Sequence, residues 1–161
     1  MKKLNNRGFT LTELIVVIAI MGILSGVVSA SISQIFANQT RKFINECDAM
    51  LTRCRVETLS GAPGGTYPDG TYVELRLDND GKYYVAYYED GNKVEEKPLK
   101  NSSASCTYTK NGATVALENG TPLWISYNRT TGAMNENCTE IAVSSSKIIL
   151  TPATGYHKVG G

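Results

Sequence analysis

A long segment almost without charge sets the strongest limit on how this chain can fold. Residues 9–36 contain one charged side chain, Glu13, and residues 14–28 read LIVVIAIMGILSGVV. About 20 apolar residues cross a bilayer as a helix, and serine is tolerated inside such helices. The segment is therefore long and apolar enough to be a membrane helix.

A basic leader precedes this segment. Lys2, Lys3 and Arg7 carry three positive charges, and residues 1–8 contain no acidic side chain. By the positive-inside rule the leader stays in the cytoplasm, so the C-terminal part of the chain is expected to be exported. A secretory signal peptide cleaved near Val28-Ser29-Ala30, a plain signal anchor and a buried core helix are the alternative interpretations.

Glu13 argues against both the signal peptide and the plain anchor. A charged carboxylate inside a membrane helix costs about 2.5–3.5 kcal/mol on insertion scales, so an intramembrane acid indicates a functional site. Such a carboxylate needs a cationic partner that can hydrogen-bond to it.

Residues 7–14 read RGFTLTEL, and this sequence resembles the processing site of type IV prepilins and of the pseudopilins of type II secretion and competence systems. The resemblance covers the leader and the first half of the helix. It implies that prepilin peptidase cuts between Gly8 and Phe9 and methylates the new amino group of Phe9. It also implies that Glu13 pairs with the N-terminal amine of a neighbouring subunit during assembly.

The same resemblance implies partners and a location. The partners would be other pilin subunits, prepilin peptidase, a membrane platform protein and an assembly ATPase. The chain would cross the cytoplasmic membrane once, with its N-terminus inside, and later form part of an extracellular pilus or pseudopilus. Many major pilins carry a proline in the middle of the mature helix, where this chain has Ala30. This departure favours a minor pilin or a pseudopilin.

Beyond the apolar segment the pattern becomes that of an amphipathic helix. One helical face carries Phe36, Phe43, Cys47, Met50 and Cys54, and Ile44, Leu51 and Leu59 widen it. The glycines and the proline of residues 61–65 end the helix. From Phe9 to Ser60 such a helix would measure about 78 Å at 1.5 Å per residue.

The C-terminal hundred residues are expected to be β-rich. Residues 72–77, 83–88 and 94–97 predict a three-strand meander, because turns with glycine separate them. Further strands are predicted at residues 105–109, 114–117, 123–127, 140–143 and 147–150. The fold class is therefore α+β, a long N-terminal helix packed on an antiparallel sheet domain. The expected divisions are a leader (1–8), a membrane half (9–36) and an amphipathic half (37–60) of the helix, and a globular domain (61–161).

Four cysteines, Cys47, Cys54, Cys106 and Cys138, form an even number in a domain expected to be exported. Cys47 and Cys54 are about 10.5 Å apart along a helix, too far to pair with each other. We expect at least one bridge from the helix to the β domain. A Cys106–Cys138 bridge, implied by the resemblance to pilins, and four buried free thiols are the alternatives. The spacing lacks the Cys-x₂-Cys pair typical of a zinc site.

Other candidate sites are weak. Residues 78–81 read DNDG and predict a hairpin turn, since the calcium ligands that should follow are absent. His157 is expected at the surface, and Arg76, Lys82, Tyr83 and Tyr84 form no compelling DNA-contacting cluster. Residues 125–132 and 148–155 share an isoleucine followed by Thr-Gly, which forms a weak internal repeat like that of certain minor pseudopilins.

Sixteen basic and fifteen acidic side chains give a net charge of +1, which does not favour nucleic-acid binding by bulk electrostatics. No catalytic constellation, metal or cofactor is predicted, so an enzyme is not expected. A structural filament subunit in a minor role is the favoured function. The alternatives are a pseudopilin of a type II secretion or competence DNA-uptake system and a tip pilin that binds DNA or a surface ligand.

Overall fold

The computed structural model describes residues 10–61, 67–100 and 103–160, although not the side chains of residues 28–30. Gly8 and Phe9 lie outside the described residues. The structure divides into two units, Met1–Phe36 (unit 1) and Ala37–Gly161 (unit 2). Each unit is described separately below.

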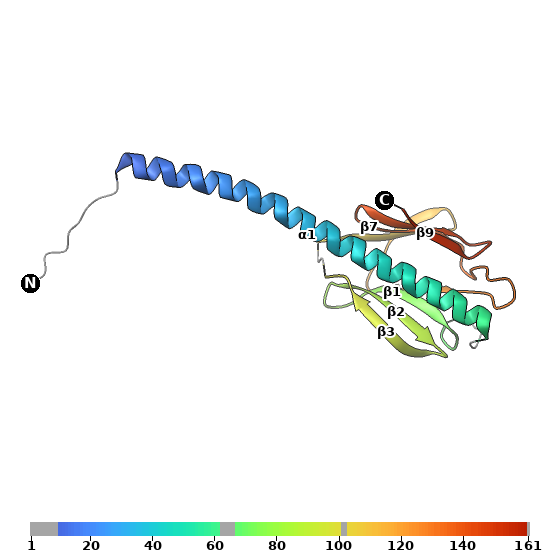
Figure 1. Ribbon diagram of the computed structural model, residues 1–161. Helices are drawn as coiled ribbons and strands as arrows, with labels where there is room; N and C mark the ends of the chain where they lie inside the picture. Colours follow the sequence, from blue (N-terminus) through green and yellow to red (C-terminus); the bar gives the residue numbers. More distant parts are fainter. Residues whose placement is uncertain (1–9, 62–66, 101–102, 161) are drawn as a thin grey trace, which may run out of the picture. The chain divides into compact units, whose positions relative to one another are not determined.

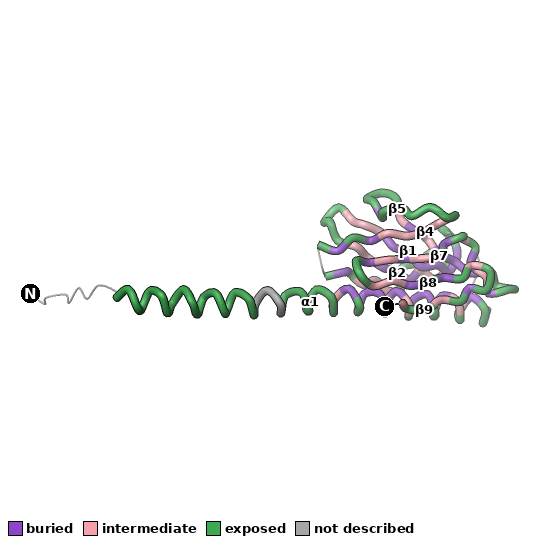
Figure 2. The backbone as a smooth tube through the Cα atoms, turned by 90° about the horizontal axis from the view of Figure 1, so that it is seen from above, coloured by how far each residue is buried: buried purple, intermediate pink, exposed green. Residues whose placement is uncertain are grey.

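Helix α1, Leu11–Ser60, contains 50 residues and contributes to both units. It contains no proline, and Gly61 follows it with a φ of 119°, a conformation that L-residues with a side chain rarely adopt. The helix therefore ends where the Gly-Pro-rich sequence predicts. In unit 1 every described side chain from Leu11 to Val27 is exposed (Figure 2).

Unit 2 contains two antiparallel sheets, which confirms the α+β class. Sheet 1 has the strand order β3-β2-β1-β6, and sheet 2 has the order β5-β4-β7-β8-β9. The strands are β1 Tyr72–Leu77, β2 Tyr83–Glu89, β3 Asn92–Pro98, β4 Cys106–Lys110, β5 Ala113–Ala116, β6 Leu123–Ser126, β7 Cys138–Val143, β8 Ser146–Thr151 and β9 Tyr156–Gly160. The predicted meander is present as β1, β2 and β3. The ninth strand and the division into two sheets are absent from the sequence-based expectation.

The C-terminal half of α1 packs against both sheets and forms the core with them (Figure 1). Phe43, Cys47, Met50 and Cys54 are at most 3% exposed, so this part of the predicted stripe is confirmed. The stripe is shorter than expected, because Leu59 is 46% exposed and Phe36 is 41% exposed. The hydrophobic core therefore includes side chains only from the middle turns of the unit 2 part of α1.

Candidate assembly site

Thr10 and Glu13 form reciprocal hydrogen bonds that cap the N-terminus of α1. The backbone N–H and the hydroxyl of Thr10 each donate to Oε2 of Glu13, at 2.9 Å in both cases. In return, the backbone N–H of Glu13 donates to the Thr10 hydroxyl oxygen at 3.2 Å. This geometry is a capping box, in which the first and fourth residues satisfy each other's free backbone N–H groups.

The capping box gives the only acid of the apolar segment a partner within its own chain. Glu13 lies in the first helical turn, where the free N–H groups of the helix favour negative charge. The carboxylate therefore stays exposed at the end of the helix, and an arriving cation can bind it. The sequence analysis missed this role of Thr10, although Thr-x-x-Glu before an apolar run is the usual signature of a capping box.

The helix surface that follows is mostly apolar in unit 1. An 18-residue window of α1 has a mean hydropathy of 2.5, and none of it is buried within the chain. Leu11, Ile23 and Val27 are each more than 60% exposed. Water does not favour so much exposed hydrocarbon, whereas a bilayer or a layer of other apolar helices would solvate it. Length and composition thus allow the helix to cross a membrane.

The four cysteines are free thiols in the structure and all are buried. The expected disulfide between α1 and the β domain is therefore not present, and neither is a Cys106–Cys138 bridge. Each thiol packs in the hydrophobic core, where Cys47 and Cys54 of α1 contribute to the same cluster as Cys106 and Cys138. The buried free thiols are the alternative that the sequence left open.

Burial makes these thiols poor nucleophiles. The loss of hydration raises the pKa of Cys54 and of Cys106 to about 12 and that of Cys138 to about 11. Burial, aided by Cys106 and by the neighbouring acids, raises the pKa of Cys47 well above its usual range. Because the thiolate is the reactive form, all four side chains stay protonated and unreactive at neutral pH.

We therefore predict that a thiol reagent such as Ellman's reagent labels no cysteine of the folded protein at pH 8 within minutes. In denaturant without reductant it should label all four. Because the thiol pKa values are so high, raising the pH to 9 should add little labelling of the folded protein. Fewer than four labelled thiols in denaturant would show that disulfides form after all.

Polar side chains fix the end of α1 to sheet 1. Oε1 of Glu57 accepts from Nε of Arg53 at 2.8 Å, and its Oε2 accepts from the hydroxyl of Tyr87 on β2. The Arg53 guanidinium lies 4.5 Å from the centre of the Tyr87 ring. The hydrogen bonds from Tyr87 and then from Arg53 hold the pKa of Glu57 below its usual range. This network orients α1 on sheet 1.

The two Thr-Gly units of the weak repeat meet in space. Gly132 follows β6 and Gly155 precedes β9, and a Cβ atom built at Gly155 would overlap the carbonyl oxygen of Gly132. Arg55 of α1 covers both turns, because its Nη2 donates to the carbonyl oxygen of Thr154 at 3.0 Å. The two Thr-Gly turns therefore pack against each other and against α1, and so connect both sheets to the helix.

The structure confirms the predicted turn at residues 78–81 and contradicts the surface position expected for His157. The loop at residues 78–81 is the predicted turn between β1 and β2, and its Asp80 already binds the Lys82 ammonium and the Tyr84 hydroxyl. The prediction for His157 was wrong, because its side chain is only 6% exposed and lies 3.0 Å from the Thr52 hydroxyl of α1. Its position on the short, unpredicted strand β9 brings it against the helix.

The candidate DNA-contacting residues are engaged with acids. Arg76 forms ion pairs with Glu74 at 3.2 Å, Glu96 at 2.6 Å and Asp78 at 3.5 Å. Lys82 pairs with Asp80 at 3.1 Å. These cations are therefore neutralised locally, and the four residues do not form a free basic patch. Within the described ranges, no group of three or more metal-ligating side chains could hold a metal ion.

One comparison with known proteins succeeds. The family model described as the prokaryotic N-terminal methylation motif matches residues 3–29. The matched region contains most of the basic leader, the Gly8-Phe9 bond, the capping box and most of the apolar segment. No curated protein and no solved structure matches the chain.

Proposed function

We propose that this chain, which carries the N-terminal methylation signature of type IV pilins and pseudopilins, is a minor subunit of a type IV pilus or pilus-like filament. Prepilin peptidase removes residues 1–8 and methylates Phe9. The mature chain waits in the cytoplasmic membrane and then enters the filament through its N-terminal helix. A platform protein and an assembly ATPase drive that step. The motif is that of structural subunits and not of an enzyme class.

The proposal rests on two observations that concern the same residues. The methylation motif falls on the same residues that form a helix with every described side chain from Leu11 to Val27 exposed and one carboxylate in its first turn. An apolar helix that packs on nothing within its own chain suits a bilayer first and a bundle of identical helices later. A secretory signal peptide needs neither the carboxylate nor the capping box.

The chemistry of assembly follows from the capping box. Cleavage gives Phe9 a cationic amine, and the Glu13 carboxylate of a neighbouring subunit can accept a charge-assisted hydrogen bond from it. In a low-dielectric environment such a pair sets the register between subunits more than it stabilises either subunit alone. The parts of the mature subunit would then be the membrane or filament-core half of the helix (9–36), its amphipathic half (37–60) and the β domain (61–161).

Two considerations favour a minor subunit. The sequence has Ala30 where many major pilins have proline. The Thr-Gly units also resemble those of certain minor pseudopilins. DNA capture is the less favoured role, because Arg76 and Lys82 are already paired with acids. A role in secretion or in competence uses the same assembly chemistry.

Substitutions at Glu13 separate its charge from its capping function. A glutamine can still close a capping box but carries no charge, so Glu13→Gln and Glu13→Ala should both be inserted and cleaved yet poorly incorporated into filaments. We expect incorporation to fall at least tenfold, since a hydrogen bond to a charged group contributes about 1.5–3 kcal/mol. The measurement is the amount of subunit in sheared filaments relative to that in membranes.

Thr10→Ala is the matched control, because it removes the two hydrogen bonds of the Thr10 hydroxyl from the cap and keeps the carboxylate. It should be incorporated nearly as well as the wild type. Normal incorporation of Glu13→Gln, or an equal loss in Thr10→Ala, would contradict an assembly role for the charge.

A further inference from the structure

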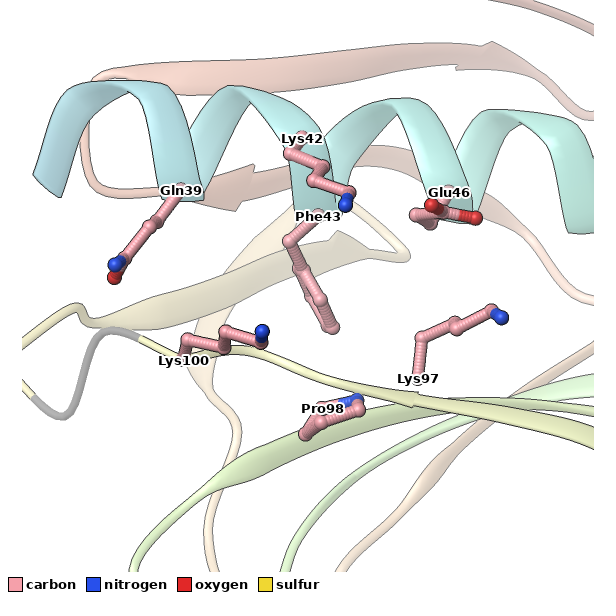
Figure 3. Close-up of a pocket in the computed structure, with 7 residues that line it drawn as sticks. All are labelled: Gln39, Lys42, Phe43, Glu46, Lys97, Pro98 and Lys100. Carbon is pink, nitrogen blue, oxygen red and sulfur yellow. The ribbon is translucent and has the colours of Figure 1, made fainter. Parts of the chain in front are cut away.

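A pocket of about 430 Å³ opens in unit 2 between α1 and the end of β3 (Figure 3). Gln39, Lys42, Phe43 and Glu46 line it from one face of α1, and Lys97, Pro98 and Lys100 line it from β3 and the residues that follow. Its volume falls in the range of small-ligand pockets. Nothing in the assembly chemistry proposed above uses it.

The pocket is locally cationic in a chain whose total charge is close to zero. Three lysines and one glutamate give its lining a formal charge of +2. Lys97 pairs with Glu95 at 3.2 Å. Lys42 and Lys100 form no ion pair with the described residues, and they extend into the pocket from opposite walls (Figure 3). Two unpaired ammonium groups across a small opening favour an anion between them.

A second observation also indicates a missing polar ligand. The side-chain oxygen Oε1 of Gln39 is buried and has no hydrogen-bond partner among the described residues. A buried polar atom without a partner is uncommon in a folded protein. An amide offers an acceptor or, after rotation of its end group, a donor. Gln39 can therefore bind either a hydroxyl group or an anionic oxygen of a ligand in the pocket.

The position of the pocket in the chain limits what can reach it. Gln39 is the third residue after Phe36, where unit 1 ends. Three residues span at most about 11 Å even when fully extended. If the apolar segment lies in a bilayer, the chain therefore holds Gln39 within about 11 Å of the end of that segment at Phe36. Phe43, which is 3% exposed, adds an apolar wall beside the ammonium groups.

We propose that this pocket binds the phosphate of an anionic phospholipid headgroup. The ammonium groups of Lys42, Lys97 and Lys100 neutralise the phosphate, Gln39 binds a hydroxylated headgroup such as glycerol, and Phe43 contacts the first carbons of the lipid. The lipid would hold the β domain against the membrane until the subunit enters a filament. This inference rests on the membrane-anchored state in the proposed function.

The test uses the full chain in neutral detergent and counts retained lipid by native mass spectrometry. Phosphatidylglycerol and phosphatidylcholine are the lipid probes, and inorganic phosphate and glycerol phosphate are the soluble ones. The wild type should retain phosphatidylglycerol in preference to phosphatidylcholine. The Lys42→Gln/Lys100→Gln variant should bind it about 25-fold more weakly, because each lysine near a lipid phosphate contributes about fivefold. The soluble phosphates should compete only weakly.

Lys110→Gln/Lys158→Gln is the matched control, because it removes the same charge from sheet 2, outside the pocket. It should retain lipid as the wild type does. Equal losses in both double variants, or equal retention of both lipids, would overturn the proposal. So would full displacement by soluble phosphate, which indicates a soluble ligand. Reduced filament incorporation without any lipid retention would assign the pocket to an acidic segment of another subunit.

A circular dichroism spectrum of each variant checks that it is folded. Lipid retention needs neither cleavage nor filaments, so it can be measured on the uncut chain. Failure of lipid binding therefore leaves the filament proposal intact, and failure of cleavage leaves the lipid measurement interpretable.

Discussion

Gly155→Ala is expected to lower the free energy of unfolding of unit 2 by about 2–5 kcal/mol. Gly155 has a φ of 66°, where a residue with a side chain costs about 1–2 kcal/mol. The new Cβ atom would also overlap the carbonyl oxygen of Gly132 and come within 3.1 Å of Nε of Arg55. Backbone cannot move aside as a flexible side chain can, so overpacking adds about 1–3 kcal/mol.

Gly120→Ala is the matched control for this prediction. Gly120 also has a positive φ, 81°, but nothing lies within 4 Å of the position of its added Cβ. Gly120→Ala should lower the free energy of unfolding only by the cost of placing a side chain at a positive φ. Thermal unfolding of the full-length protein in detergent, followed by near-ultraviolet circular dichroism, measures both variants. The melting temperature should fall by about 10 °C or more for Gly155→Ala and by a few degrees for Gly120→Ala. Equal decreases would show that the two Thr-Gly turns do not form a tight contact.

Gly8→Val is expected to abolish processing. A residue without a side chain lets the chain thread into the narrow site of a peptidase, whereas a β-branched side chain is bulky and stiff next to the bond to be cut. The variant should therefore accumulate in the membrane as a precursor eight residues longer than the mature wild type. Co-expression with a prepilin peptidase and separation on a high-resolution gel would reveal the heavier band.

Gly22→Val serves as the control for that experiment. It introduces the same side chain into the apolar segment, where nothing lies within 4 Å of the added Cβ. It should be cleaved normally. A fully cleaved Gly8→Val variant would mean that the peptidase does not recognise this bond.

The local features of the fold could be predicted from the sequence. The end of α1 at Ser60 follows from the glycines and proline of residues 61–65, and the strands β1 and β2 follow from alternating apolar residues between glycine turns. These signals act between near neighbours in the chain, so a single sequence contains them.

The arrangement of the strands could not be predicted in the same way. β6 leaves its sequence neighbours β5 and β7 in sheet 2 and pairs with β1, where Val73 faces Ile125. The position of β6 in sheet 1 depends on pairing between segments that are distant in the sequence and on the core side chains that α1 contributes. β9 escaped prediction because residues 156–160, YHKVG, lack a clear apolar alternation.

The candidate sites also divide into those with a local sequence signature and those that depend on contacts between distant segments. The Thr10–Glu13 capping box could have been found in the sequence, because its four-residue signature is local. The lysine pocket could not, since Lys42 and Lys100 meet only after β3 packs near α1. The number of cysteines left bridges and buried free thiols open as alternatives, and the four thiols are free and buried in the structure.

The most direct test of the central claim is the mass of the N-terminal peptide of the mature protein, purified from cells that contain prepilin peptidase. The account predicts a peptide that begins at Phe9 and carries one methyl group on its α-amino nitrogen. A peptide that begins at Met1, or one that begins at Ser31 after cleavage behind Val28-Ser29-Ala30, would contradict it.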